Sequence, residues 1–151
     1  MFSVRPMLEK KQRSHDFSWP MQNIKMAPNV STPQEQYESS KGSRVISFHS
    51  TSKWKTHFEA SKRTNRLVVI YFTATWCGPC RHMEPLINNF ANLYPDVEFI
   101  KIDVDELMSV AEMFVVRTMP TFVLIKRGDV IDRVVGAKKD DLQMKIQKHR
   151  I

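Results

Sequence analysis

The chain has 151 residues, of which 42% are hydrophobic and 26% charged, and it carries a formal net charge of +7. This length holds one ordinary domain. Its longest apolar run, about six residues, is far short of the roughly 20 that span a bilayer. Basic residues alternate with acids, as in Lys101-Ile102-Asp103, so we expect a solvated surface and no nucleic-acid partner. Two cysteines are too few for the disulfide framework of a small secreted scaffold.

Residues 1–44 lack any apolar periodicity. Serine, proline and glutamine dominate Ser31–Gln36, and Ser39–Ser43 has the composition of a linker. Such a segment buries too little apolar surface to offset its ordering entropy, so we predict a disordered extension. Without a secretory or membrane signal we expect a cytoplasmic protein. The basic residues within 1–25 leave a mitochondrial address as the alternative.

From residue 45 the pattern becomes regular and predicts one domain over 45–151. Residues 45–48 form a short strand, and Thr51 or Ser52 caps the helix that follows. Residues 66–72 are apolar on both faces, as in the middle of a covered sheet. A long helix then spans residues 78–94, with Pro85 inside it. Its inward positions are predicted at helical spacing: Met83, Leu86, Ile87, Phe90 and Leu93.

The second half of this domain continues the alternation and ends in a hairpin. We predict a strand over 97–102, a short helix over 105–114, and strands over 121–125 and 130–135 around a tight glycine-containing loop. A helix over 138–148 closes the chain. The order β-α-β-α-β-α-β-β-α predicts an α/β protein, a mixed sheet of about five strands with helices on both faces.

The only two cysteines, Cys77 and Cys80, stand where a strand gives way to the long helix. The thiolate is the reactive form of cysteine, and a helix N-terminus favours that anion. We therefore predict that Cys77 is an exposed nucleophile and that Cys80, one turn on, is a partly buried resolving thiol. Gly78 permits close approach, and Pro79 is tolerated in a first turn.

Other uses of this cysteine pair stay open at this point. Zinc sites use the same spacing but need two more ligands. His49, His57 and His82 are available, without a paired spacing or a second cysteine pair. Two inert structural cysteines are the remaining alternative.

Several motifs together resemble the thioredoxin family. Residues 76–80, Trp-Cys-Gly-Pro-Cys, are similar to its active-site sequence, and Pro85 to its helix-kinking proline. Thr118-Met119-Pro120 resembles its cis-proline loop and Val135-Gly136-Ala137 its closing loop. The runs Asp103–Leu107 and Phe122–Gly128 look most like plant h-type members.

This resemblance implies a thioredoxin fold and a protein-disulfide reductase without a bound cofactor or metal. It implies a monomer whose redox-active Cys77–Cys80 disulfide is re-reduced by a thioredoxin reductase. A substrate segment would pair its backbone beside the proline loop. The implied contact residues are Trp76, Thr118, Met119, Pro120, Val135, Gly136 and Ala137.

One position departs from the family pattern. A buried aspartate usually stands six residues before the first cysteine and assists deprotonation of the resolving thiol, and here that residue is Tyr71. The lysine that accompanies it is kept as Lys101. A phenol, with a reference pKa near ~10, is a poor proton acceptor at neutral pH. We hypothesise that Cys80 loses its proton more slowly, or through water or Lys101.

The segment Met26–Thr32 resembles the opening of h-type members that are myristoylated. Ala27 stands where the acylation pattern requires glycine. We therefore expect neither acylation nor stable membrane association.

A rival from another functional class is an adaptor or chaperone of the same fold, with weak redox turnover. The substitution at Tyr71 and the long extension favour it. The complete cysteine pair favours the reductase, because an adaptor has no need of a resolving thiol.

Overall fold

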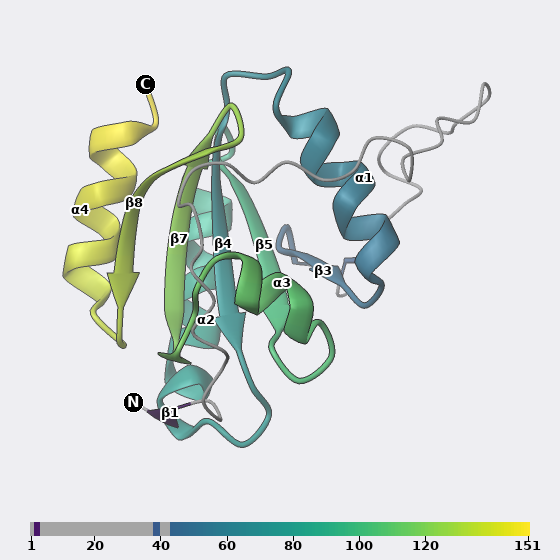
Figure 1. The fold of residues 1–151 in the computed structure, drawn as a ribbon. Helices are drawn as coiled ribbons and strands as arrows, with labels where there is room; N and C mark the ends of the chain where they lie inside the picture. The colour runs from purple at the N-terminus through teal and green to yellow at the C-terminus, as the bar shows by residue number, and fades with distance from the viewer. Residues whose placement is uncertain (1, 4–37, 40–42) are drawn as a thin grey trace.

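A mixed sheet forms the centre of the molecule, as the computed structural model in Figure 1 shows. The structure describes residues 2–3, 38–39 and 43–151. Five strands lie in the order β3-β5-β4-β7-β8, and a two-residue strand extends the β3 edge. The first three of the five run parallel, and β7 and β8 are antiparallel to their neighbours. The bounds are β2 Glu38–Ser39, β3 Ile46–Phe48, β4 Leu67–Thr73, β5 Glu98–Asp103, β7 Thr121–Lys126 and β8 Asp129–Val135. The predicted mixed sheet of about five strands is confirmed.

Helices cover both faces of this sheet. Trp54 of the first helix meets Phe114, which ends the third helix, at a ring-centroid distance of 6.2 Å. On the other face, Gln143 and Gln147 of the last helix donate to the Tyr94 hydroxyl at the end of the second. The bounds are α1 Thr51–Ser61, α2 Gly78–Leu93, α3 Met108–Met113 and α4 Lys139–His149. The predicted element order is confirmed.

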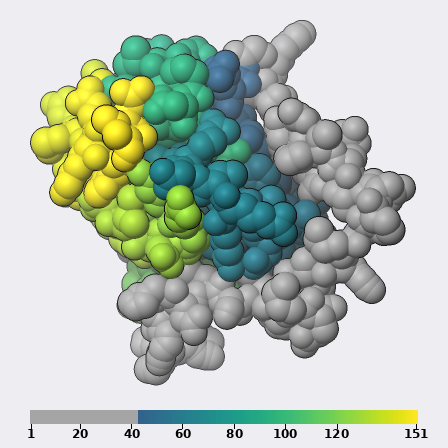
Figure 2. Space-filling view, turned by 90° about the horizontal axis from the view of Figure 1, so that it is seen from above, coloured from purple at the N-terminus to yellow at the C-terminus, as the bar shows by residue number. Residues whose placement is uncertain are grey.

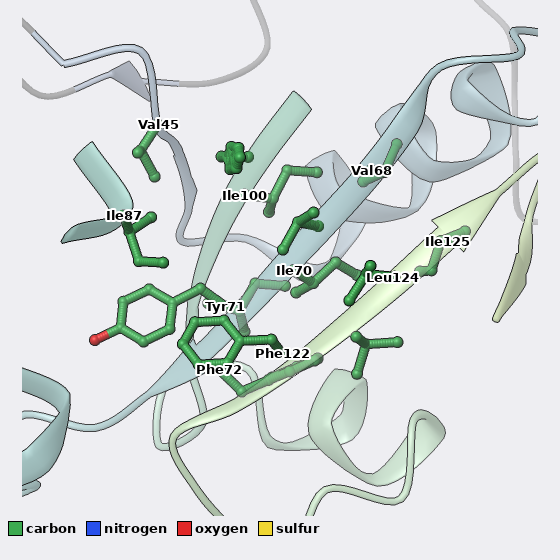
Figure 3. Close-up of a cluster of buried hydrophobic side chains, with 14 of the residues drawn as sticks. Val45, Val68, Ile70, Tyr71, Phe72, Ile87, Ile100, Phe122, Leu124 and Ile125 are labelled. Atoms are coloured by element: carbon green, nitrogen blue, oxygen red, sulfur yellow. The ribbon is translucent and has the colours of Figure 1, made fainter. Parts of the chain in front are cut away.

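The central strand β4 carries the cores on both faces. All seven of its residues are buried, as its continuous apolar run predicts. Successive side chains of a strand point to opposite faces. Phe72 therefore meets Phe114 on the α1 and α3 face, whereas Tyr71 stacks on Phe122 with the ring centroids 5.2 Å apart. Figure 3 shows the Tyr71 hydroxyl pointing away from the cluster of apolar side chains.

Two predicted helix starts are wrong. Ser50, rather than Thr51 or Ser52, caps α1, because its backbone is extended and its side chain accepts from Lys53 N. The third helix begins at Met108 rather than at residue 105. A turn precedes it, in which Asp103 accepts hydrogen bonds from the N–H groups of residues 105, 106 and 107.

One predicted core position in α2 is also wrong. Met83, Ile87 and Phe90 are buried as expected, and Leu86 packs partly against the core. Leu93, in contrast, is 57% exposed, whereas Phe90 and Ala91 of the same turn are buried, so the Leu93 side chain faces away from the core. Pro85 lies inside α2, as predicted.

Three short strands, β1, β2 and β6, lie outside the predicted pattern. β1 (Phe2–Ser3) pairs antiparallel with β6 (Thr118–Met119), with Phe2 opposite Met119 and Ser3 opposite Thr118. β1 and β2 fall within the segment predicted as an extension. Most of that segment, including Met26–Thr32, lies outside the described residues, so the domain boundary near residue 45 stays a prediction.

The two ends of the sheet carry different structures. Figure 2 looks at the end where β7 turns into β8, and the turn after α1 lies beside that hairpin. Arg127 there donates to Asn65, and Gly128 approaches the Lys62 side chain. The cysteines follow the carboxyl end of β4, at the end of the sheet opposite to that hairpin.

In the part of the chain that the structure describes, no helix is long and apolar enough to cross a membrane.

Candidate active site at the carboxyl end of the central strand

A disulfide joins Cys77 and Cys80, whose Cα atoms are 5.3 Å apart. Cys77 is the N-cap of α2 and Cys80 lies in its first turn, as the sequence predicts. Pro79, also in this turn, needs no hydrogen-bond acceptor there. The Cys80 N–H donates to Cys77 Sγ at 3.1 Å, so a backbone dipole points at this sulfur. The helix N-terminus therefore favours negative charge on Cys77 in the reduced protein.

The predicted exposure of Cys77 is wrong for this oxidised state. Cys77 is 0% exposed and Cys80 is 1% exposed. The physical reason is that Cys77 Sγ turns toward the helix, where it is bonded to Cys80 and accepts a backbone N–H. A reductant must therefore reach the disulfide by way of neighbouring residues that are exposed.

Trp76 is the exposed neighbour on the strand side of the disulfide. It is 43% exposed, and its Nε1–H donates to Asp105 Oδ2 at 2.9 Å. Asp105 follows β5, whose end lies next to the end of β4, so the parallel pairing brings the two residues together. Sequence reasoning missed this role of Asp105, although the turn after a neighbouring strand is a place to look for such a partner.

The proline loop and the closing loop meet at this same end of the sheet. Phe72, near the end of β4, is opposite Thr121, the first residue of β7, and Thr121 is opposite Val135. The Met119–Pro120 peptide bond is cis, and Gly136 N donates to Pro120 O at 2.8 Å. Six of the seven residues predicted to contact substrate therefore gather on two adjoining loops, and Trp76 lies between β4 and α2.

Accessibility differs among those residues. Val135 and Ala137 are exposed, Thr118 is half-buried, and Met119 and Pro120 are buried. A partner at this surface would therefore meet side chains of the closing loop but mainly the backbone of the proline loop.

The Tyr71 hydroxyl lies next to the backbone of Cys80. Its hydroxyl is 2.8 Å from Cys80 O and 3.2 Å from Glu84 Oε2, within donating distance of both. Burial raises the pKa of the Tyr71 phenol, and the nearby Glu84 carboxylate raises it further. Tyr71 therefore stays protonated at neutral pH and donates a proton to neighbouring oxygens rather than accepting one.

Glu84 is a residue of this region that sequence reasoning missed. Lys101, opposite Tyr71 in the sheet register, donates to Glu84 Oε1 at 3.2 Å, and its Nζ forms an ion pair with Oε2 at 3.1 Å. The sequence signal for Glu84 was its position four residues after Cys80, because residues at this spacing lie on the same side of a helix. Cys80, Glu84 and Lys101 line one cavity of about 450 Å³.

The zinc alternative loses its support here. Both thiols are joined to each other, and His49 and His57 pair with Glu106 and Glu98. Across residues 2–3, 38–39 and 43–151, no group of three or more His, Cys, Asp or Glu side chains is placed to hold a metal ion.

Comparisons with known proteins agree with this geometry. The thioredoxin family model matches residues 45–148. Thioredoxin H2 of Arabidopsis thaliana is 52% identical over 111 residues, 74% of this chain and 84% of that protein. Thioredoxin H-type 1 of Nicotiana tabacum is 48% identical over 124 residues, 82% of this chain and 94% of that protein. The crystal structure of thioredoxin NaTrxh from Nicotiana alata superposes with a TM-score of 0.72 at 58% identity, covering 76% of this chain and 99% of that one.

A helix-capping Cys-Gly-Pro-Cys disulfide, a cis-proline loop beside it and these similarities lead to one conclusion. The chain belongs to the thioredoxin family, is similar to its plant h-type members, and is a thiol–disulfide oxidoreductase.

Proposed function

We propose that the reduced protein transfers two electrons to disulfides of other proteins, with Cys77 as nucleophile and Cys80 as resolving thiol. The Cys77 thiolate attacks a substrate disulfide and forms a mixed disulfide, releasing the first substrate sulfur as a thiolate. The Cys80 thiolate then attacks Cys77 Sγ, which releases the second substrate thiolate and leaves the Cys77–Cys80 disulfide. The substrate gains two electrons and the cysteine pair loses two.

The position of Cys77 at the N-cap of the 16-residue helix α2 carries this proposal. A substrate that approaches beside Trp76, the exposed residue before Cys77, has an extended backbone edge at Thr118 and Met119 to pair with. Trp76, Val135 and Ala137 supply the exposed side chains around it. Such an arrangement favours an extended peptide segment over a small folded ligand.

The remaining parts of the proposal follow from the family. A thioredoxin reductase supplies the electrons, and the protein works as a monomer in the cytoplasm. No cofactor takes part beyond the cysteine pair.

Trapping tests the assigned roles. A reduced Cys80→Ser variant is expected to stay joined to a disulfide-containing protein such as insulin through Cys77, because no thiol is left to resolve the bond. Non-reducing gels and mass spectrometry of the joined peptide measure this product. The matched control, Cys77→Ser, keeps only the Cys80 thiol, which lies inside the first turn of α2 rather than at its N-cap, and should trap far less. Equal trapping through Cys80 would reverse the assignment.

A further inference from the structure

We propose that Glu84 accepts the proton that the Cys80 thiol loses when it resolves the mixed disulfide. The proposal rests on the resolving role proposed above for Cys80. Resolution needs the thiolate, and a cysteine thiol with a reference pKa of about 8.5 is mostly protonated at neutral pH. A nearby acceptor is therefore required, and Tyr71, which donates its hydroxyl proton, does not supply it.

Glu84 is the carboxylate placed for this task. It lies one helical turn after Cys80, and both line the same cavity of about 450 Å³. The Glu84 and Lys101 side chains are each 36% exposed, so water enters the cavity beside them. Two groups hold the carboxylate: the Lys101 ammonium lies 3.2 Å from Oε1 and 3.1 Å from Oε2, and the Tyr71 hydroxyl lies 3.2 Å from Oε2. A fixed carboxylate in a wet cavity can take a proton from the thiol through one water molecule.

The other charged groups around the cavity are less suited to accept this proton. Arg81 and Lys101 are cations, and Arg81 donates to Thr75 O. His49 and Glu106 are occupied with each other at 2.9 Å. Asp103 accepts the Asp105 N–H at the end of β5. On β4, the Tyr71 hydroxyl is a donor toward Cys80 O and Glu84 Oε2 rather than an acceptor.

The proposed step balances as follows. The Cys80 proton passes through water to a Glu84 oxygen, and the thiolate forms a bond to Cys77 Sγ. The bond between Cys77 and the substrate sulfur breaks, and its electron pair leaves with the substrate thiolate. The proton on Glu84 then returns to solvent or to that thiolate. In this arrangement Tyr71 and Lys101 hold the carboxylate that replaces the missing aspartate, and act as positioning residues.

The test follows the two phases of a single turnover with a fluorescent peptide disulfide in excess over reduced full-length protein. The fast phase reports the bond to Cys77 and the second phase reports release by Cys80. Glu84→Gln keeps the shape and its contact with Tyr71 but removes the acceptor. We expect its second phase to be about tenfold slower at pH ~7. This loss is smaller than the full rate enhancement that a general base typically supplies. The difference should vanish above about pH 9, where most of the thiol ionises unaided.

Three further variants make the result specific. Glu84→Asp should restore most of the neutral-pH rate, and Tyr71→Phe should keep the shape of the pH profile. Glu112→Gln, a charge-matched control on the exposed side of α3, should behave as the unmodified protein. A second phase unchanged in Glu84→Gln, or slowed equally at every pH, would overturn the proposal. Loss of the first phase would point instead to failure of the proposed roles of the cysteines.

A different observation carries a second inference: we infer that β1 competes with protein substrates for the edge of β6. Phe2 is opposite Met119 and Ser3 is opposite Thr118 in an antiparallel ladder. This is the backbone edge to which the proposed substrate segment pairs. One edge cannot hold two strands, so the chain's own N-terminal strand and a substrate exclude each other. The pairing involves two residues, which makes it easy to displace.

Proline substitution in the full chain tests this competition. Proline lacks the N–H that a ladder needs, so Phe2→Pro with Ser3→Pro removes the pairing. The KM for insulin should fall about two- to fivefold with kcat unchanged, as expected when a partly populated closed state is lost. The control, Gln12→Pro with Ser14→Pro, should leave KM unchanged. Reduction of a small aromatic disulfide, which needs no strand pairing, should be equal in all three proteins. An insulin KM that stays the same in the Phe2 and Ser3 variant would refute the inference.

Discussion

A Cys77→Ser variant is expected to reduce insulin no faster than the reductant alone. The serine hydroxyl is a far weaker nucleophile than a thiolate at neutral pH. Cys80, inside the first turn of α2, lacks the N-cap position that favours the Cys77 anion and does not take its place. Because the two cysteines act as a unit, the loss should be as large as that of the double variant, on the order of 10³-fold or more. The measurement is the rate of insulin precipitation with dithiothreitol as electron source.

The same assay separates the reductase from the adaptor. An oxidoreductase gives catalysis in the unmodified protein and none in Cys77→Ser. If neither protein catalysed reduction while both still bound a partner, the adaptor function would be supported and the proposed electron transfer contradicted. Far-UV circular dichroism of both proteins provides the folding control, since the substitution is close to isosteric.

Local patterns in the sequence predicted most of the fold. Leu67–Thr73 is apolar at every position, and only a strand covered on both faces buries such a run. The hairpin around Gly128 was predicted from turn residues, and the structure gives this glycine a φ of +87°. Errors arose where several local solutions compete. Ser50, Thr51 and Ser52 can each cap a helix, and only the backbone conformation at Ser50 decides among them.

The site was predictable where its residues adjoin the cysteines and not where it depends on contacts across the fold. Trp76 and Pro79 adjoin the cysteines in sequence. Pro79 lies in the first turn of α2, as predicted, and the substrate contact of Trp76 stays a prediction. Asp105 contacts Trp76 only because β5 ends beside β4, and Glu84 contacts Tyr71 only because α2 packs against β4. Their roles require the strand register and the direction of a side chain, neither of which a periodic pattern specifies.

The surroundings of Tyr71 show what the fold places beside a missing family residue. The sequence identifies the loss of an acid on β4. The structure shows that the replacing hydroxyl reaches the carbonyl of Cys80 and the carboxylate of Glu84. The Glu84 carboxylate of α2 therefore lies beside the β4 position at which the family usually has an aspartate. Comparing single positions detects the missing aspartate, and only the packed structure shows the glutamate next to it.

Phe114→Ala is expected to lower the free energy of unfolding by about 3–5 kcal/mol, the range for removal of a fully buried phenylalanine. Phe114 is 0% exposed, and its ring lies within 6.2 Å, centroid to centroid, of three others. Those rings belong to Trp54 and Phe58 of α1 and Phe72 of β4. The alanine would therefore leave a cavity where two helices meet the central strand, and edge-to-face contacts with Trp54 and Phe58 would be lost as well.

Urea unfolding of the oxidised proteins at one temperature measures this loss, since all variants keep the same disulfide. Phe114→Leu, which refills much of the volume, should cost about 1 kcal/mol. Met108→Ala, at a 44% exposed position of α3, should stay within about 0.5 kcal/mol of the unmodified protein. A loss below about 1 kcal/mol for Phe114→Ala would mean that α3 moves in to close the cavity. The aromatic cluster would then not be what fixes α1 and α3 to the sheet.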